Sequence, residues 1–190
     1  MLYLWPGNTP IPELPSTFGN MTAAHAETVP HGIRAGRWFA VGNECFTRPF
    51  SIDRMQHHLA KLTPYRDKCL FVILPDIDWR NGERVFDANV AIDLFNEWKT
   101  HPVFDGWKKA FVAQNGQEHL EFPNGLDCLF IGGDTDWKLL AHAESCIKRA
   151  QSMNLGTHIG RVNTKRRIEH FDFLGNDSID GTGPVFHPSD

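Results

Sequence analysis

The chain has few cysteines and no long apolar segment, and both absences narrow the kinds of protein that it can be. It has four cysteines in 190 residues; none forms a CxxC pair, and none stands with histidines at zinc-ligand spacing. The longest apolar runs, 69–75 and 126–133, are too short to cross a bilayer, and the first residues do not form a secretory signal. We therefore expect a cytoplasmic protein with no membrane partner and no metal site.

Several nucleotide-binding and hydrolase signatures are also missing. The sequence contains no GxGxxG, no GxxxxGK[ST] and no GxSxG motif. The formal net charge of −4 argues against nucleic-acid binding through the overall charge of the protein, but it does not exclude a local basic patch. The hydrophobic share of 41% excludes general disorder, and the length suits one domain over residues 1–190.

What the chain does have is an alternation of short apolar runs and longer segments of helical periodicity. The predicted strands are 2–5, 38–41, 69–74, 110–113, 128–131, 157–159 and 178–179. The predicted helices are 51–62, 85–98, 137–153 and 164–174, the last with Thr164 as N-cap and Gly175 as closing residue. Residues 9–36 are expected to form an irregular loop with one short helix. The alternation predicts an α/β fold with a mostly parallel sheet, either a compact (β/α) barrel or an open doubly wound sheet.

Polar residues and glycines follow most of the apolar runs. In a parallel sheet these positions gather at the carboxyl edge, where active sites of α/β proteins lie. One of the two carboxylates can accept two N–H groups of a guanine-like base, and the Gln114 amide can donate to a ring carbonyl. The other carboxylate is then free to attack an anomeric carbon. The residues that end the runs are Asp76, Gln114, Gly132, Gly133, Gly160, Arg161 and Asp180.

Four segments carry a resemblance to a known family: 111–118, 129–138, 158–167 and 177–183. In order and spacing they resemble the tRNA-guanine transglycosylase (queuine tRNA-ribosyltransferase) superfamily, and within it the DpdA-type deazapurine DNA modification proteins, many of them encoded by phages. The resemblance implies a TIM-type barrel and a pentosyltransferase reaction that uses no cofactor. An aspartate attacks the sugar to form a covalent intermediate, guanine leaves, and a 7-deazaguanine such as 7-cyano-7-deazaguanine (preQ0) enters.

The resemblance also assigns residues of this chain. It makes Asp180 the nucleophile and Asp76 the second catalytic residue, which recognises the base. The residues it places on the substrate are Gln114, Gly132, Gly133, His158, Gly160, Arg161 and Asn163. Lys165, Arg166 and Arg167 open a predicted helix, where positive charge opposes the helix dipole, so we expect them to meet nucleic-acid phosphates.

Two departures from the family pattern bear on the chemistry. Gly42 stands where the family usually carries another aspartate, and Asn43 or Glu44 is a hypothetical substitute for it. Ten residues follow Asp180, so the zinc subdomain of the tRNA enzymes is not expected, which favours DNA over tRNA. The expected partners are DNA and a free 7-deazaguanine base, with a homodimer or a helper protein left open.

Two other functions agree with the same residues. Loss of the aspartate at Gly42 would leave a binding module for deazapurine or DNA without turnover. If water resolved the sugar intermediate instead of a base, the protein would be an N-glycoside hydrolase of the same fold. Taken singly the motifs also have plainer explanations, since Asp180-Gly181 and the residues after Gln114 suit turns and a basic run suits a solvated helix face.

Overall fold

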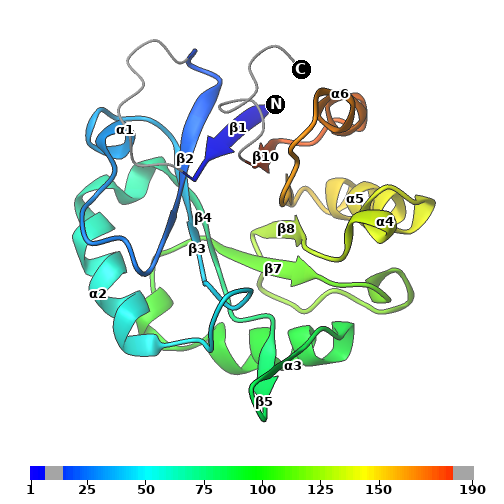
Figure 1. Ribbon diagram of the computed structural model, residues 1–190, viewed down its shortest axis with the longest axis horizontal. Helices are drawn as coiled ribbons and strands as arrows, with labels where there is room; N and C mark the ends of the chain where they lie inside the picture. The colour runs from blue at the N-terminus through cyan, green and yellow to red at the C-terminus, as the bar shows by residue number, and fades with distance from the viewer. Residues whose placement is uncertain (7–14, 182–190) are drawn as a thin grey trace.

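Eight parallel strands close into a barrel, and helices lie around its outside (Figure 1). The computed structural model describes residues 1–6 and 15–181. In spatial order the strands are β1 (Leu2–Trp5), β10 (Ser178–Asp180), β9 (Gly156–Ile159), β8 (Cys128–Ile131), β7 (Lys109–Ala113), β4 (Cys69–Ile73), β3 (Phe39–Gly42) and β2 (Phe18–Ala23), which pairs again with β1. The predicted α/β barrel is confirmed as a closed parallel barrel compatible with a TIM type, and the open-sheet alternative is wrong.

The helices form where apolar periodicity and capping residues predict them. In order they are α1 (His31–Arg34), α2 (Ile52–Leu62), α3 (Ala88–Trp98), α4 (Thr135–Lys138), α5 (Ala141–Ser152) and α6 (Lys165–Phe173), with 3-10 turns η1 (Thr63–Lys68), η2 (Pro102–Phe104) and η3 (Gln117–His119). Asp87 caps α3 by accepting the backbone N–H of Asn89 at 2.8 Å. Gly175 closes α6 at φ +74°, as predicted, whereas the Thr164 side chain makes no capping hydrogen bond.

One barrel strand escapes the sequence prediction. The seven predicted strands are confirmed to within about one residue at each end, but Phe18–Ala23 lies in the stretch predicted to be irregular and instead forms β2. Its polar side chains Asn20 and Thr22 are buried, so the strand has no apolar alternation to reveal it. The short helix expected in that stretch is α1, and residues 9–14 lie outside the described part of the chain.

Two further differences arise in the connections. The predicted helix 137–153 is divided between α4 and α5, because the backbone of Leu140 is extended (φ −96°, ψ 164°) and interrupts the helix there. The start of the predicted helix 85–98 belongs instead to a hairpin of β5 (Asp78–Arg80) and β6 (Glu83–Val85). Asn81 and Gly82 both have positive φ at its tip, the geometry of a type I′ turn, so the Asn-Gly pair was an available signal.

Two apolar layers hold the barrel and set the depth of the site. The larger layer lies between strands and helices and includes Phe39, Leu62, Phe95 and Phe111. The smaller one fills the barrel interior with Leu4, Ala40, Phe71, Ile73, Ala110, Val112 and Cys128. Because this interior is packed, a ligand reaches only the ends of the barrel. Within the described residues no helix is long and apolar enough to span a membrane.

Candidate active site

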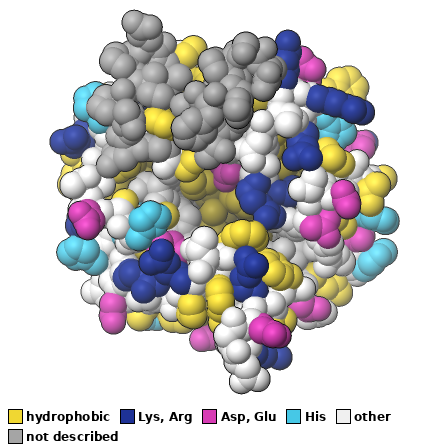
Figure 2. Space-filling view, in the orientation of Figure 1, with side chains coloured by type: hydrophobic (Ala, Val, Ile, Leu, Met, Phe, Trp, Pro, Cys, Tyr) yellow, Lys and Arg dark blue, Asp and Glu magenta, His cyan; other side chains and the backbone are white. Residues whose placement is uncertain are grey.

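A cavity of about 380 Å³ opens at the carboxyl end of the barrel. Its size falls in the lower range of small-molecule pockets. The space-filling view shows a hollow near the middle of the molecule, with hydrophobic side chains on its floor and Lys or Arg at its edge (Figure 2). The floor is made by Met21, Ile73, Val112 and Phe130. The polar side chains of the wall are Asn43, Glu44, Thr47, Asp76, Gln114, Arg161 and Asp180.

Asp76 is a buried carboxylate on this wall. It follows β4 and is only 6% exposed. The Asn43 amide donates to one carboxylate oxygen at 2.7 Å, and the Gln114 amide donates to the other at 2.8 Å. Burial raises the pKa of Asp76 to about 6 although both hydrogen bonds favour the charged form. Asp76 is therefore mostly ionised at neutral pH, and it takes up a proton under mildly acidic conditions.

Asp180 ends β10 and lines the same cavity. One carboxylate oxygen accepts the backbone N–H of Arg161 at 2.6 Å. The other lies 3.2 Å from Nε2 of His158. Since the side chain is 16% exposed, it is held by two donors and still reaches the cavity. The structure thus brings Asp76 and Asp180, the two residues expected to be catalytic, to one pocket.

His158 is fully buried inside the barrel and lies outside the cavity wall. Its Nδ1 is 2.8 Å from Oγ of Ser178, and its ring packs 4.7 Å from that of Phe130. An ionised Asp180 accepts only, so a neutral His158 carries its proton on Nε2 and receives the Ser178 hydroxyl proton on Nδ1. His158, expected on the substrate, therefore lies beneath the cavity, where its ring contacts Asp180.

The other residues expected on the substrate divide into two groups. Gln114, Gly132 and Arg161 line the cavity, whereas Gly133 lines a neighbouring hollow of about 250 Å³. Gly160 and Asn163 are not in the wall of either. A Cβ on Gly160 would lie 2.7 Å from the Phe130 ring, so this glycine is required for packing.

Arg161 connects the loops that follow three strands. Its backbone is left-handed at φ +61°, and its guanidinium donates to the carbonyl oxygens of Gly132 at 2.9 Å and Gly133 at 2.5 Å. Its backbone N–H holds Asp180 at the same time. One residue therefore fixes the glycine pair and the carboxylate relative to each other.

The expected basic cluster stands at the start of α6, with Lys165 and Arg166 exposed and Arg167 partly buried. A cation that the sequence did not reveal lies close by. Lys138 is 5% exposed, and its ammonium donates to the carbonyl of Gly160 at 2.6 Å. Burial, with the nearby charges of Arg161 and Arg167, lowers the pKa of Lys138 to about 7 against the opposing effect of Asp180 and Asp134. Lys138 supports the loop that carries Arg161.

The position where the family pattern has an aspartate can be examined directly. Gly42 lines the cavity, and a Cβ there would be 3.5 Å from its nearest neighbour, so the glycine leaves an open place in the wall. The two hypothetical substitutes, Asn43 and Glu44, also line the cavity, and each is already in contact with other side chains. Asn43 is bound to Asp76, and the Glu44 side chain, 3% exposed, pairs with His25 and, at 3.5 Å, with Arg54.

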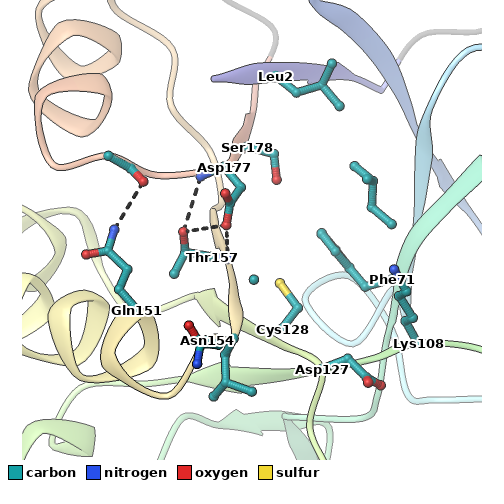
Figure 3. A pocket seen from close by; sticks show the side chains of 14 residues that line it. Leu2, Phe71, Lys108, Asp127, Cys128, Gln151, Asn154, Thr157, Asp177 and Ser178 are labelled. Carbon is teal, nitrogen blue, oxygen red and sulfur yellow. Dashed lines mark hydrogen bonds between the residues drawn. The ribbon is translucent and has the colours of Figure 1, made fainter.

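A larger hollow, of about 690 Å³, lies at the opposite end of the barrel (Figure 3). Several of its polar groups already bind the chain. Asp177 accepts the backbone N–H and the hydroxyl of Thr157 at 2.8 and 3.1 Å, and the Gln151 amide donates to the Leu174 carbonyl at 3.0 Å. These hydrogen bonds connect the starts of β9 and β10 and the end of α6. We therefore infer that the residues at this end of the barrel stabilise the fold.

Comparison with known proteins adds no family to this description. No protein-family model matches the chain, and no curated protein matches it. Within residues 1–6 and 15–181, no group of three or more His, Cys, Asp or Glu side chains gathers as metal ligands would.

The pKa of Asp76 makes a prediction about stability. The folded carboxyl has a pKa of about 6 against 3.8 for the ordinary group, so the folded state binds the proton more tightly. The contribution of Asp76 to the free energy of unfolding should therefore be full below pH 4 and should fall by about 2 to 3 kcal/mol as the pH rises to 7, whereas His58, whose pKa burial lowers to about 4, contributes in the opposite direction in both proteins. Urea unfolding of the wild type and Asp76→Asn at both pH values measures this difference, which the variant should lose. Parallel pH dependence in the two proteins would contradict the assignment.

Proposed function

We propose that the protein is a DNA guanine transglycosylase, which exchanges guanine for a 7-deazaguanine base such as preQ0. The observation that carries the proposal is that Asp76 and Asp180, 104 positions apart in the sequence, line one cavity suited to a small planar ligand. The four segments that resemble the transglycosylase superfamily supply Gln114, Arg161 and Asp180 of the polar wall. The exchange calls for no metal or redox cofactor.

The cavity suits a purine held flat over apolar side chains. The carboxylate of Asp76 accepts the ring N–H and the exocyclic amine of guanine, and the Gln114 amide reaches the ring carbonyl. Gly132 lines this cavity, and a Cβ there would lie 2.4 Å from the Val112 side chain, so packing requires the glycine as it does at Gly160. A 7-deazaguanine has the same hydrogen-bonding edge, so one pocket receives both the leaving and the entering base.

The reaction follows from the position of Asp180. Its carboxylate forms a bond to C1′ of the deoxyribose while the bond from C1′ to the base nitrogen breaks and its electrons remain on the base. The departing guanine takes a proton from solvent and the entering base gives one up to solvent, because an ionised Asp76 accepts hydrogen bonds from both bases and has no proton to donate. The entering base then displaces Asp180 from C1′.

A target inside a duplex cannot reach the floor of this cavity. The guanine nucleotide must leave the base stack, which costs a few kcal/mol and is cheapest in single-stranded DNA. The basic residues Lys165, Arg166 and Arg167 would hold the backbone beside the site.

The proposal is tested with guanine-containing single-stranded DNA and labelled guanine or preQ0. Label retained in the DNA is the expected result. Release of guanine with no label incorporated would indicate a hydrolase, and base binding with neither outcome would indicate a binding module, the alternative that Gly42 favours. Either of these two results would contradict the exchange reaction.

His158 provides a prediction about positioning. Replacing it with Asn removes the ring that orients Asp180, and we expect kcat for exchange to fall about 10²-fold, as misplacement of a reacting group by 1 Å can cause. The dissociation constant for free guanine should stay unchanged, because the base contacts Asp76 and Gln114. Ser178→Ala, which removes only the donor to Nδ1, should have a smaller effect. A parallel loss of guanine affinity in His158→Asn would show general distortion instead.

A further inference from the structure

Two exposed phenylalanines stand at the mouth of the cavity. Phe46 is 45% exposed and Phe86 is 49% exposed, and their ring centroids are 6.1 Å apart. Both line the cavity and also the neighbouring 250 Å³ hollow. Large apolar side chains kept in water beside a pocket mark a contact surface. The purine cavity alone does not need this second compartment.

Two guanidinium groups accompany the rings. That of Arg84 lies 4.6 Å from the Phe46 centroid and 5.2 Å from the Phe86 centroid, and that of Arg161 lies 4.7 Å from the Phe46 centroid. In the part of the chain that the structure describes, neither arginine is paired with a carboxylate. We call Phe46, Phe86, Arg84 and Arg161 the aromatic rim. It offers π faces and two guanidinium groups in one place.

The aromatic rim is held in position by the β5–β6 hairpin. The Trp79 indole donates to the carbonyl of Cys45 at 3.0 Å, and Arg84 donates to the carbonyl of Phe46 at 2.8 Å. The hairpin is therefore fastened to the turn that follows β3. A surface fixed in this way can bind a ligand without first becoming ordered.

We propose that the aromatic rim binds the nucleotide next to the target in a single strand of DNA, stacking its base on Phe86 and pairing its phosphate with Arg84 or Arg161. The proposal rests on the proposed function, because it takes the target base to lie in the main cavity. Stacked aromatics with arginines form the usual surface for unpaired bases. The two compartments share Phe46, Phe86, Gln114 and Arg161, so adjacent nucleotides reach them together.

The test measures oligonucleotide and free-base binding separately. The oligonucleotide is a strand of thymidines with one guanine, and its binding is measured by fluorescence anisotropy. The binding of free guanine is measured by calorimetry. Phe86→Ala should weaken oligonucleotide binding about 5- to 100-fold, the usual effect of losing one stacking platform. Phe86→Leu, which keeps apolar surface and loses the ring, should weaken it as well. Because Phe86 also lines the main cavity, free guanine should lose some affinity in these variants, but several-fold less than the oligonucleotide loses.

A matched control is Phe173→Ala, which removes an 89% exposed phenylalanine at the end of α6, the helix end away from the mouth. It should leave oligonucleotide affinity unchanged. Oligonucleotides lacking the base on one or the other side of the guanine complete the test. Removing the base that stacks on Phe86 should weaken oligonucleotide binding to the wild type by the same factor as the Phe86→Ala substitution does. It should not weaken binding to Phe86→Ala any further.

The outcomes separate this proposal from the exchange reaction. Oligonucleotide binding that depends on Phe86 in a protein without exchange activity would contradict the chemistry and support the aromatic rim. A wild type that binds guanine and no oligonucleotide, or Phe86→Ala binding as tightly as the wild type, would overturn the aromatic rim. Self-association of the chain that disappears in Phe86→Ala, with oligonucleotide binding unchanged, would show a second copy as the occupant and overturn it too.

Discussion

Asp180→Asn should abolish base exchange, with a loss of at least about 10³-fold in kcat, because an amide does not form the bond to C1′. The substitution is nearly isosteric. Its carbonyl oxygen still accepts the Arg161 backbone N–H, so the loop should remain in place. Affinity for free guanine should be retained, since the base is held at Asp76. The measurement is label incorporation at saturating DNA, together with calorimetry on guanine.

Asp136→Asn is a suitable control for this variant. Asp136 is an exposed carboxylate in the first turn of α4, and it lines neither the cavity nor the neighbouring hollow. Its loss changes the net charge as Asp180→Asn does and should leave exchange at the wild-type rate. Exchange that continues undiminished in Asp180→Asn would remove Asp180 from the chemistry.

Asp76→Asn should lower the affinity for free guanine by about 100-fold or more at pH 7. The variant loses two hydrogen bonds to a charged acceptor, each contributing roughly 1.5–3 kcal/mol. Competition calorimetry with guanine and preQ0 measures the effect. For the wild type, affinity should rise between pH 5 and pH 7 as Asp76 ionises with its pKa of about 6, and the variant should show no such rise.

The fold should tolerate this change for a reason visible in the site. Asn43 cannot turn its amide, because it also donates to the Leu74 carbonyl at 2.6 Å and accepts the Cys45 N–H at 3.0 Å. The Gln114 side chain donates to Asp76, and its amide can rotate to accept instead from the amide that the substitution introduces. Guanine affinity within threefold of the wild type would contradict the role of Asp76 in recognition.

Those parts of the architecture that depend on periodicity could be predicted from the sequence. Apolar runs bounded by Gly, Pro or Asp marked seven of the eight barrel strands, since buried parallel strands are continuously apolar. The eighth strand, β2, could not be predicted in this way, because two of its buried side chains, Asn20 and Thr22, are polar. Closure of the barrel could not be derived from local pattern, because it depends on β1 pairing with both β2 and β10.

The sequence predicts the position of a site residue where the end of a strand fixes it. It does not predict the position of a residue that is set by contacts with another element. Asp76, Gln114 and Asp180 lie at strand ends, so parallel topology brings them together. His158 lies in the same kind of segment, but its strand position turns it into the barrel, onto Ser178 and Asp180. The burial of Lys138 depends on packing against Gly160 and Arg167, which no sequence spacing reveals.

The most direct test of the central claim is a crystal structure of the protein soaked with guanine or preQ0. We expect one purine in the carboxyl-end cavity, its amine and ring N–H on Asp76, and the nitrogen that bears the sugar turned toward the Asp180 carboxylate. A purine bound at the opposite end of the barrel, or one in the cavity with that nitrogen facing away from Asp180, would contradict the claim that these two carboxylates act on one nucleotide.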